Sequence, residues 1–133
     1  MKIGFANGVF DILHFGHIYL FREAKKQVDF LVVGINTDES TKRLKGNGRP
    51  INNMIHRLSI LQELKPIDLV LPFSEDTPEK IIKAIKPDIL FKGGDWKKED
   101  VVGKDFVESY GGRVEIIQLI PGISTSIIEG KLK

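Results

Sequence analysis

Residues 3–17 read IGFANGVFDILHFGH, and this stretch decides the fold. Its apolar start, Ile3–Ala6, predicts a buried β-strand, and its end runs into an amphipathic helix predicted over His17–Lys26. A turn that contains Gly8 and Gly16 joins the two. A strand, a glycine-containing turn and a helix in this order open a βαβ unit, which places the turn at the carboxyl end of a strand in a parallel sheet.

The rest of the chain repeats this alternation of short apolar runs and amphipathic stretches. Strands are predicted at Phe30–Ile35, Leu69–Leu71, Ile89–Phe91 and Val114–Ile120, and helices at Asn53–Leu64, from Pro78 to about Ile85 behind a Thr77 N-cap, at Asp100–Tyr110 and at Ser124–Leu132. This order predicts one α/β domain over residues 1–133, a Rossmann-like doubly wound fold with a five-stranded parallel sheet. Ligands bind such sheets beyond the carboxyl ends of the strands, so we expect the chemistry in the loops that follow strands.

Size and composition fit one globular domain that binds a small anionic ligand. The chain has 133 residues, of which 41% are hydrophobic and 29% charged, and these values are ordinary for a soluble domain. The net charge is +2, without a dense basic stripe or an aromatic–basic platform, which argues against nucleic acid as a partner. The absence of cysteine excludes disulfides and thiolate metal sites.

The amino-terminal residues and the hydropathy pattern indicate where in the cell the protein is expected. The start, MKIGFANGVFD, has no apolar segment of the kind found in signal peptides. No apolar run approaches the ~20 residues that span a bilayer. We therefore expect a cytoplasmic protein without a membrane partner.

The segment Asn36–Asn52 is predicted to be a long loop. It contains several basic residues and two glycines, namely Lys42, Arg43, Lys45, Arg49, Gly46 and Gly48. Loops above roughly 12–15 residues are uncommon and often functional. A basic loop with glycine hinges beside an anion site would act as a lid, and a solvated surface loop is the alternative.

The first turn holds two histidines, His14 and His17, in the pattern His-x-Gly-His. At this spacing both imidazoles can face one ligand, and the free N–H groups at the start of a helix favour anions. Donors placed around the equatorial oxygens of a phosphoryl group stabilise its transition state. Zinc is the alternative, but zinc needs three or four ligands and the third histidine, His56, falls on a different predicted helix. We therefore expect phosphate chemistry and no protein-bound metal.

The segment GVFDILHFGH resembles the signature of the HxGH cytidylyltransferase-like nucleotidyltransferases. Further segments resemble the bacterial D-glycero-β-D-manno-heptose 1-phosphate adenylyltransferase domain, namely TDESTKRLKG at 37–46, Arg49-Pro50, Arg57, KGGD at 92–95 and GISTS at 122–126. The glycerol-3-phosphate cytidylyltransferases share several of these motifs. The likeness covers nearly the whole chain, with the motifs in the expected order.

The resemblance implies a role for each matching residue. The catalytic residues would be His14, His17 and Lys45. The nucleotide would contact Gly8, Val9, Phe10, His14, His17, Lys92, Gly93, Asp95, Ser124, Thr125 and Ser126, the last three through the start of the final helix. The phosphorylated acceptor would contact Asp11, Asp38, Lys42, Lys45 and Arg57.

Three of these assignments have simpler alternatives. The hydroxyls of residues 124–126 would also serve as plain N-caps of a helix. Arg57 would also fit a solvent-facing charge on its helix. Asp95 would also fit a turn residue in Gly-Gly-Asp-Trp.

The resemblance implies transfer of AMP from ATP to a sugar 1-phosphate. The acceptor phosphate would attack the α-phosphorus in line and release pyrophosphate, and Mg²⁺ would be bound through the triphosphate. Relatives are commonly dimers, so the resemblance also implies a homodimer. The bifunctional heptose enzymes carry a sugar kinase domain as well, and this chain would act without one.

The choice between ATP and CTP depends on a few positions. Asn7, the basic segment and KGGD favour ATP, as does the lack of an arginine at 119–121, where the cytidylyl relatives have one. Trp96 after Gly-Asp and the Gly-Ile-Ser-Thr segment are closer to the cytidylyl relatives, which act on CTP and the polyol ester glycerol 3-phosphate. Ser126 and residues 52–56 depart from the usual pattern of the adenylyl family. A non-catalytic nucleotide-binding module on the same fold is a further alternative.

Overall fold

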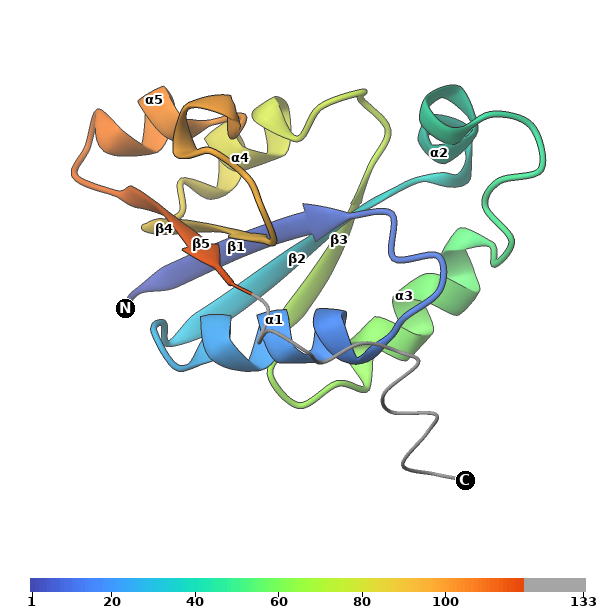
Figure 1. Ribbon diagram of the computed structural model, residues 1–133, viewed down its shortest axis with the longest axis horizontal. Coiled ribbons are helices and arrows are strands. Elements are labelled where there is room, and N and C mark those ends of the chain that lie inside the picture. The colour runs from blue at the N-terminus through green and yellow to red at the C-terminus, as the bar shows by residue number, and fades with distance from the viewer. Residues whose placement is uncertain (119–133) are drawn as a thin grey trace.

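A computed structural model describes residues 1–118 of the chain. Its centre is a five-stranded parallel sheet in the order β3-β2-β1-β4-β5 (Figure 1). The strands are β1 Ile3–Gly8, β2 Phe30–Asn36, β3 Leu69–Phe73, β4 Ile89–Gly93 and β5 Arg113–Ile117. The doubly wound Rossmann-like fold predicted from the alternating pattern is thus confirmed.

Helices cover both faces of the sheet. They are α1 Phe15–Lys25, α2 Asp38–Lys45, α3 Met54–Gln62, α4 Glu79–Ile85 and α5 Lys104–Glu108, with a 3-10 turn, η1, at Lys98–Asp100. Figure 1 shows α1 and α3 against one face and α4 and α5 against the other, with α2 beyond one end of the sheet. None of the helices within residues 1–118 is long and apolar enough to cross a membrane.

Alternation along the strands fills a core on each face. Phe5 and Val32 face α4 and α5 and pack with Ile82, whereas Ala6 and Val33 face α1 and α3. Because strand side chains point to opposite faces in turn, the nearly continuous apolar runs seen in the sequence serve both cores at once.

The strand order fixes where a ligand can bind. From the central strand β1 the chain moves outward to β2 and β3, and then crosses over to β4 on the other side of β1. The connections after β1 and after β4 therefore lie on opposite faces and leave a crevice at the carboxyl ends of these two strands.

The long loop predicted at Asn36–Asn52 is wrong in part, because residues 38–45 form helix α2. Thr37 caps this helix by accepting a hydrogen bond from the Ser40 N–H at 3.2 Å. Arg43 ties the helix to the loop after β3 through Asp76 and the Ser74 carbonyl. The sequence DESTKRLK has almost no apolar residues, so its helical character leaves no periodic signal.

Other element boundaries also differ from the predictions. Helix α1 begins at Phe15 behind a His14 N-cap, and Pro78 rather than Thr77 occupies the N-cap position of α4. The helix predicted at Asp100–Tyr110 is divided, because Gly103 adopts a φ of +94° and α5 starts only after it. The last predicted strand ends at Ile117, and the predicted helix Ser124–Leu132 lies outside the described residues.

Aspartates brace the amino-terminal edge of the sheet. Asp29, Asp68 and Asp88 each precede a strand, and their carboxylates accept the backbone N–H of Lys2, Leu31 and Ile3, at or next to the start of the neighbouring strand, at 2.7–2.8 Å. Asp68 also pairs with the Lys25 ammonium. Burial by itself raises the pKa of Asp68, but the bonds from Lys25 and Leu31 outweigh it and lower that pKa below its ordinary value.

This bracing predicts an acid-dependent contribution to stability. A lowered carboxyl pKa stabilises the fold above the unfolded value of about 3.9, and this stabilisation is lost as the pH falls through the folded pKa. Asp68→Asn should reduce the free energy of unfolding by about 1–3 kcal/mol at neutral pH, measured by urea denaturation. The difference from the parent protein should shrink below about pH 4.

The matched control is Glu79→Gln, which removes an exposed carboxylate paired only with Lys83 on its own helix. That change should alter stability by less than about 0.5 kcal/mol. A loss in Asp68→Asn that stays constant down to pH 2 would show that the charge of Asp68 is not what stabilises the edge.

Candidate active site

The two histidines form the amino-terminal cap of α1. His14 is the N-cap residue, and its Nδ1 accepts the Gly16 N–H at 3.0 Å. His17 lies three residues later, and its Nδ1 accepts the His14 N–H at 3.3 Å. This reciprocal arrangement is a capping box, usually built from Ser or Thr with Glu or Gln. The three-residue spacing of the motif is therefore the spacing that a helix cap requires.

The cap also decides where the imidazole protons lie. A ring nitrogen that accepts a hydrogen bond carries no proton, so the neutral form of each ring has its proton on Nε2. Burial lowers the pKa of His17 to about 4, and the neighbouring His14 adds to the effect. His17 is thus a neutral Nε2–H donor at physiological pH.

Aromatic contacts hold the two rings in place. The ring centroids of His14 and His17 lie 4.0 Å apart, and the Phe10 ring meets His17 edge-on with centroids 5.3 Å apart. Phe10 adopts a left-handed φ of +51° and packs on Phe21 in the core. A side chain at Gly8 would come within 2.9 Å of the Phe10 ring, so the turn requires glycine at this position.

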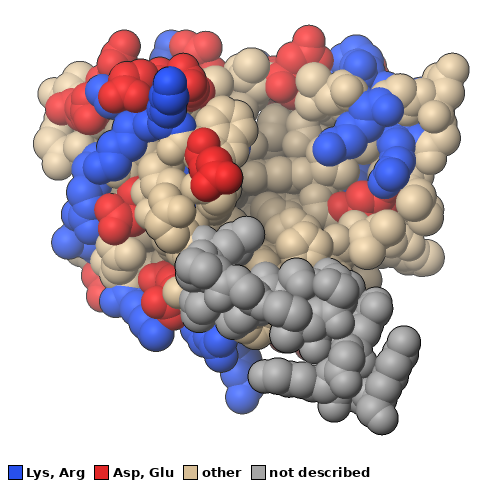
Figure 2. All heavy atoms as spheres, viewed as in Figure 1, with Lys and Arg blue, Asp and Glu red and all other residues tan. Residues whose placement is uncertain are grey.

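A cavity of about 460 Å³ opens in front of this turn. Its walls come from the ends of β1 and β4, from the start of α1 and from the segment around α2, as the strand order requires. Lining residues are Asn7, Gly8, Val9, Phe10, Asp11, Ile12, His14, Gly16, His17, Leu20, Lys45, Arg49, Phe91, Lys92, Gly93 and Trp96. Figure 2 shows the molecule hollowed between the α4–α5 side and α2, with Lys and Arg side chains gathered over α2.

The structure brings most of the predicted site residues to this cavity. Those that line it are Gly8, Val9, Phe10, Asp11, His14, His17, Lys45, Lys92 and Gly93. Asp38 and Lys42 line an adjoining cavity of about 800 Å³ between α2 and the start of α3. Asp95 lines a smaller recess beside Trp96. Ser124, Thr125 and Ser126 lie outside the described residues.

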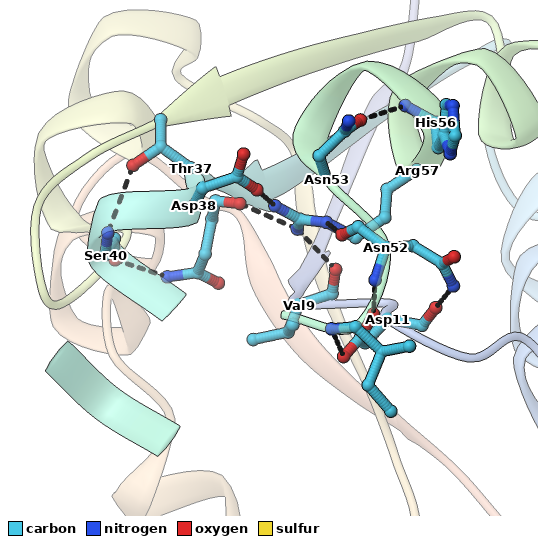
Figure 3. A network of polar contacts seen from close by, with 11 residues as sticks. Val9, Asp11, Thr37, Asp38, Ser40, Asn52, Asn53, His56 and Arg57 are labelled. Carbon is cyan, nitrogen blue, oxygen red and sulfur yellow. Dashed lines mark hydrogen bonds and ion pairs between the residues drawn. The ribbon is translucent and has the colours of Figure 1, made fainter. Parts of the chain in front are cut away.

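Arg57 does not lie where the sequence suggested. We expected either a contact with the acceptor or a solvent-facing charge, but its side chain is 1% exposed. Its guanidinium donates to the carbonyls of Val9, Asn36 and Asn52 and to the Asp38 carboxylate, at 2.7–3.0 Å (Figure 3). Four of its five N–H donors are thus used within the protein. Arg57 instead joins the segments after β1 and β2 to the start of α3.

Asp11 is also occupied by the protein itself. Its carboxylate accepts the N–H groups of Ile51 and Asn52 at 2.7 and 2.8 Å and pairs with Arg49 at 3.3 Å. Burial acts to raise its pKa, but these hydrogen bonds outweigh it and hold the pKa below its ordinary value. Asp11 thus links the histidine turn to residues 49–52 in this structure (Figure 3), and its contact with the acceptor stays a prediction.

Several lining residues lie outside the predicted site set, and Arg49 and Trp96 are two of them. Arg49 was visible as one of four basic residues in its segment, and Trp96 as part of the Gly-Asp-Trp likeness, but neither pattern shows that a side chain faces the cavity. Among residues 1–118, no three His, Asp or Glu side chains are grouped closely enough to hold a metal ion.

Comparisons with known proteins agree with this geometry. A family model described as cytidylyltransferase-like matches residues 5–131. The bifunctional protein HldE of Granulibacter bethesdensis is 50% identical over 99% of this chain, and that of Marinomonas sp. is 54% identical over 96%. The chain spans 27% of the length of each of these two relatives.

Solved structures extend the likeness. A lipopolysaccharide core biosynthesis protein from Thermoplasma volcanium is 37% identical with a TM-score of 0.71, over 90% of this chain and 97% of that one. Pantothenate synthetase from Thermus thermophilus has a TM-score of 0.57 at 15% identity, over 98% of this chain and 64% of that one, and shows the fold alone.

The buried guanidinium predicts a sharp response to a conservative change. Arg57→Lys should lower the free energy of unfolding by about 2–4 kcal/mol, because a lysine cannot reach all four acceptors and leaves buried carbonyls unpaired. Urea denaturation measures this loss. Arg22→Lys on the exposed face of α1 is the control and should change stability by less than about 0.5 kcal/mol. Equal stability of Arg57→Lys and the parent protein would contradict the network.

The proton positions assigned to the two imidazoles can be tested by NMR. Nitrogen-15 spectra of the side chains at pH 7 should show His17 as the Nε2–H tautomer, and acid titration should give a midpoint at about 4. Because the unfolded chain binds this proton at a pKa of about 6.5, His17 lowers the free energy of unfolding as the pH falls between these two values. An Nδ1–H tautomer, or a midpoint near 6.5, would refute the cap-based assignment.

Proposed function

The chain belongs to the cytidylyltransferase-like family of nucleotidyltransferases, and from this premise we propose that it transfers AMP from ATP to a sugar 1-phosphate of the heptose type. The products are an ADP-sugar and pyrophosphate. One observation carries the proposal: His14, His17, Lys45 and Lys92 line a single cavity at the start of a helix. Imidazole N–H donors and lysine cations together suit a polyphosphate.

The proposed reaction needs no protein nucleophile. An oxygen of the acceptor phosphate attacks the α-phosphorus in line, a new P–O bond forms, and the bond to the β-phosphate oxygen breaks to release pyrophosphate. The acceptor phosphate is already ionised at neutral pH, so no general base is required. This agrees with Asp11, a carboxylate that lines the cavity and is fully engaged by backbone N–H groups and Arg49.

The side chains act by position and charge. The Nε2–H of each histidine would donate to oxygens of the α-phosphoryl group, where negative charge develops in the transition state. Lys45 and Lys92 would offset the charge of the triphosphate from two sides of the cavity. Mg²⁺ would enter with the nucleotide as part of the substrate, held by the phosphate oxygens.

The choice of ATP and a heptose phosphate has separate support. The motifs TDESTKRLKG and KGGD resemble the heptose 1-phosphate adenylyltransferases, and a lipopolysaccharide core biosynthesis protein is 37% identical to this chain. Asp38 and Lys42 in the adjoining cavity of about 800 Å³ would meet the acceptor. Trp96 in the cavity wall favours the second candidate, transfer of CMP from CTP to glycerol 3-phosphate.

Pyrophosphate release tests the proposal. We expect release with Mg²⁺, ATP and heptose 1-phosphate, and little release when CTP or glycerol 3-phosphate replaces its counterpart. Release with CTP and glycerol 3-phosphate instead would support the proposed mechanism but show that these two compounds are the substrates. No release from any pair, together with tight nucleotide binding, would favour a non-catalytic nucleotide-binding module.

The two roles of each histidine can be separated by substitution. His14→Asn keeps an N-cap acceptor, and His17→Gln keeps the usual partner in a capping box, but neither keeps the rigid ring that holds an N–H donor opposite the cap acceptor. Both variants should retain nearly full stability and lose about 10²–10³-fold in kcat.

Alanine at either position is the comparison, since it should lose activity and also about 1 kcal/mol of stability with the cap. A His14→Asn or His17→Gln enzyme with kcat near that of the parent would mean that the histidine serves only to cap the helix.

A further inference from the structure

Lys92 lies in an unusual environment at the end of β4. Its ammonium group sits over the indole ring of Trp96, 4.7 Å from the ring centroid. Gly93, Gly94 and Asp95 separate the two residues, and Gly94 adopts a φ of +95°, which turns the chain back so that Trp96 reaches Lys92. Both side chains line the cavity that His14 and His17 also line.

The charge of Lys92 is not balanced by any carboxylate within residues 1–118. Lys25, Lys26, Lys83 and Lys104 each pair with an Asp or Glu, but no ion pair of the described residues includes Lys92. Burial lowers the pKa of this lysine, and no carboxylate of residues 1–118 offsets the loss of hydration of its ammonium. A half-buried cation in this state has unused capacity to bind an anion.

The indole ring and an anion can occupy different sides of the ammonium. A ring face attracts a cation through its quadrupole but accepts no strong hydrogen bond from it. An ammonium has three N–H donors, and the ring covers only one side of it, so donors remain for the cavity. The ring also restricts a long side chain that would otherwise lose rotamer entropy when it binds an anion.

We propose that Trp96 is a positioning residue that holds the Lys92 ammonium toward the cavity for the phosphate chain of the nucleotide. The ring contacts the cation on one side and the polyphosphate binds it on the other. The identity of the polyphosphate as part of a nucleotide rests on the proposed function, whereas the anion site itself rests on the geometry of this pair.

The pair predicts graded losses in affinity. A cation–π contact of about 0.5–2 kcal/mol corresponds to roughly a 2–30-fold change in a dissociation constant. Trp96→Leu should weaken binding by this factor, and Trp96→Phe, which restores a ring face, should recover part of it. Lys92→Met, which removes the charge, should weaken binding by at least about tenfold.

Inorganic tripolyphosphate is the probe, because it has the phosphate chain but no base or sugar. Calorimetry on the full chain gives its dissociation constant for the parent protein and each variant. Trp96 is the only tryptophan, so its fluorescence adds a direct signature: tripolyphosphate should change the emission of the parent protein and not that of Lys92→Met. Trp96→Leu should also raise KM for the nucleotide more than it lowers kcat.

A second cation–π pair provides the control. Lys86 lies 4.9 Å from the centroid of the Tyr110 ring, and neither residue lines the histidine cavity. Lys86→Met therefore removes one lysine charge and one such contact elsewhere in the fold. It should leave the affinity for tripolyphosphate within about twofold and keep the change in Trp96 emission.

The outcomes separate this proposal from the proposed reaction. No binding of tripolyphosphate by the parent protein, unchanged affinity in Trp96→Leu, or a full emission change in Lys92→Met would each overturn the role of the pair. If tripolyphosphate binds and Trp96→Leu weakens it while no pyrophosphate is ever released, the anion site stands and the reaction fails. If pyrophosphate is released but Trp96→Leu binds tripolyphosphate as tightly as the parent protein does, the proposed reaction is supported and the proposed role of Trp96 is refuted.

Discussion

The buried guanidinium of Arg57 is the constraint on which the site depends. Three carbonyls from the segments after β1 and β2 and before α3, together with the Asp38 carboxylate, converge on one planar group. Burying a cation is unfavourable unless its N–H donors are hydrogen-bonded. The loss of one acceptor would therefore destabilise the contacts of Arg57 with all three segments. Asp11 adds a second link from the histidine turn to residues 49–52. The cavity thus has a rigid wall on the side of α2 before any ligand binds.

The opposite wall is rigid for a different reason. There the histidines belong to a helix cap, so the hydrogen bonds that end the helix also fix the tautomer and direction of each ring. The structural requirement of the helix cap is thus met by the same two rings that we propose to act on the nucleotide. The Nδ1 atoms serve the fold and the Nε2 atoms are left for chemistry, which is an economical form of preorganisation.

The sequence predicted what depends on local apolar pattern and missed what depends on long-range polar contacts. The five strands and their parallel order follow from short apolar runs separated by helices, and the crevice follows from that order. Helix α2 was missed because DESTKRLK has no apolar face, and α1 was begun too late because histidine is a rare N-cap. The burial of Arg57 was out of reach, since its acceptors come from positions 5 to 48 residues away. The contact of Lys92 with Trp96 depends on the turn at Gly94, and the sequence alone does not show where that turn directs the chain.

Helix α2 has one more consequence, and it concerns how such a protein changes over evolutionary time. The helix lies beyond the end of the sheet, is attached through Arg43 and Asp38, and carries Lys42 into the cavity that adjoins the histidines. Within the helix Ser40 and Thr41 are fully buried, and Ser40 bonds to Asn36 and to the Glu75 carbonyl, whereas Lys42 and Lys45 are exposed, so substitutions are tolerated only on the exposed face. The fold therefore confines evolutionary change in this helix to its solvent-facing residues, and a substitution there can alter the charge of the cavity wall while the buried residues keep the helix in place.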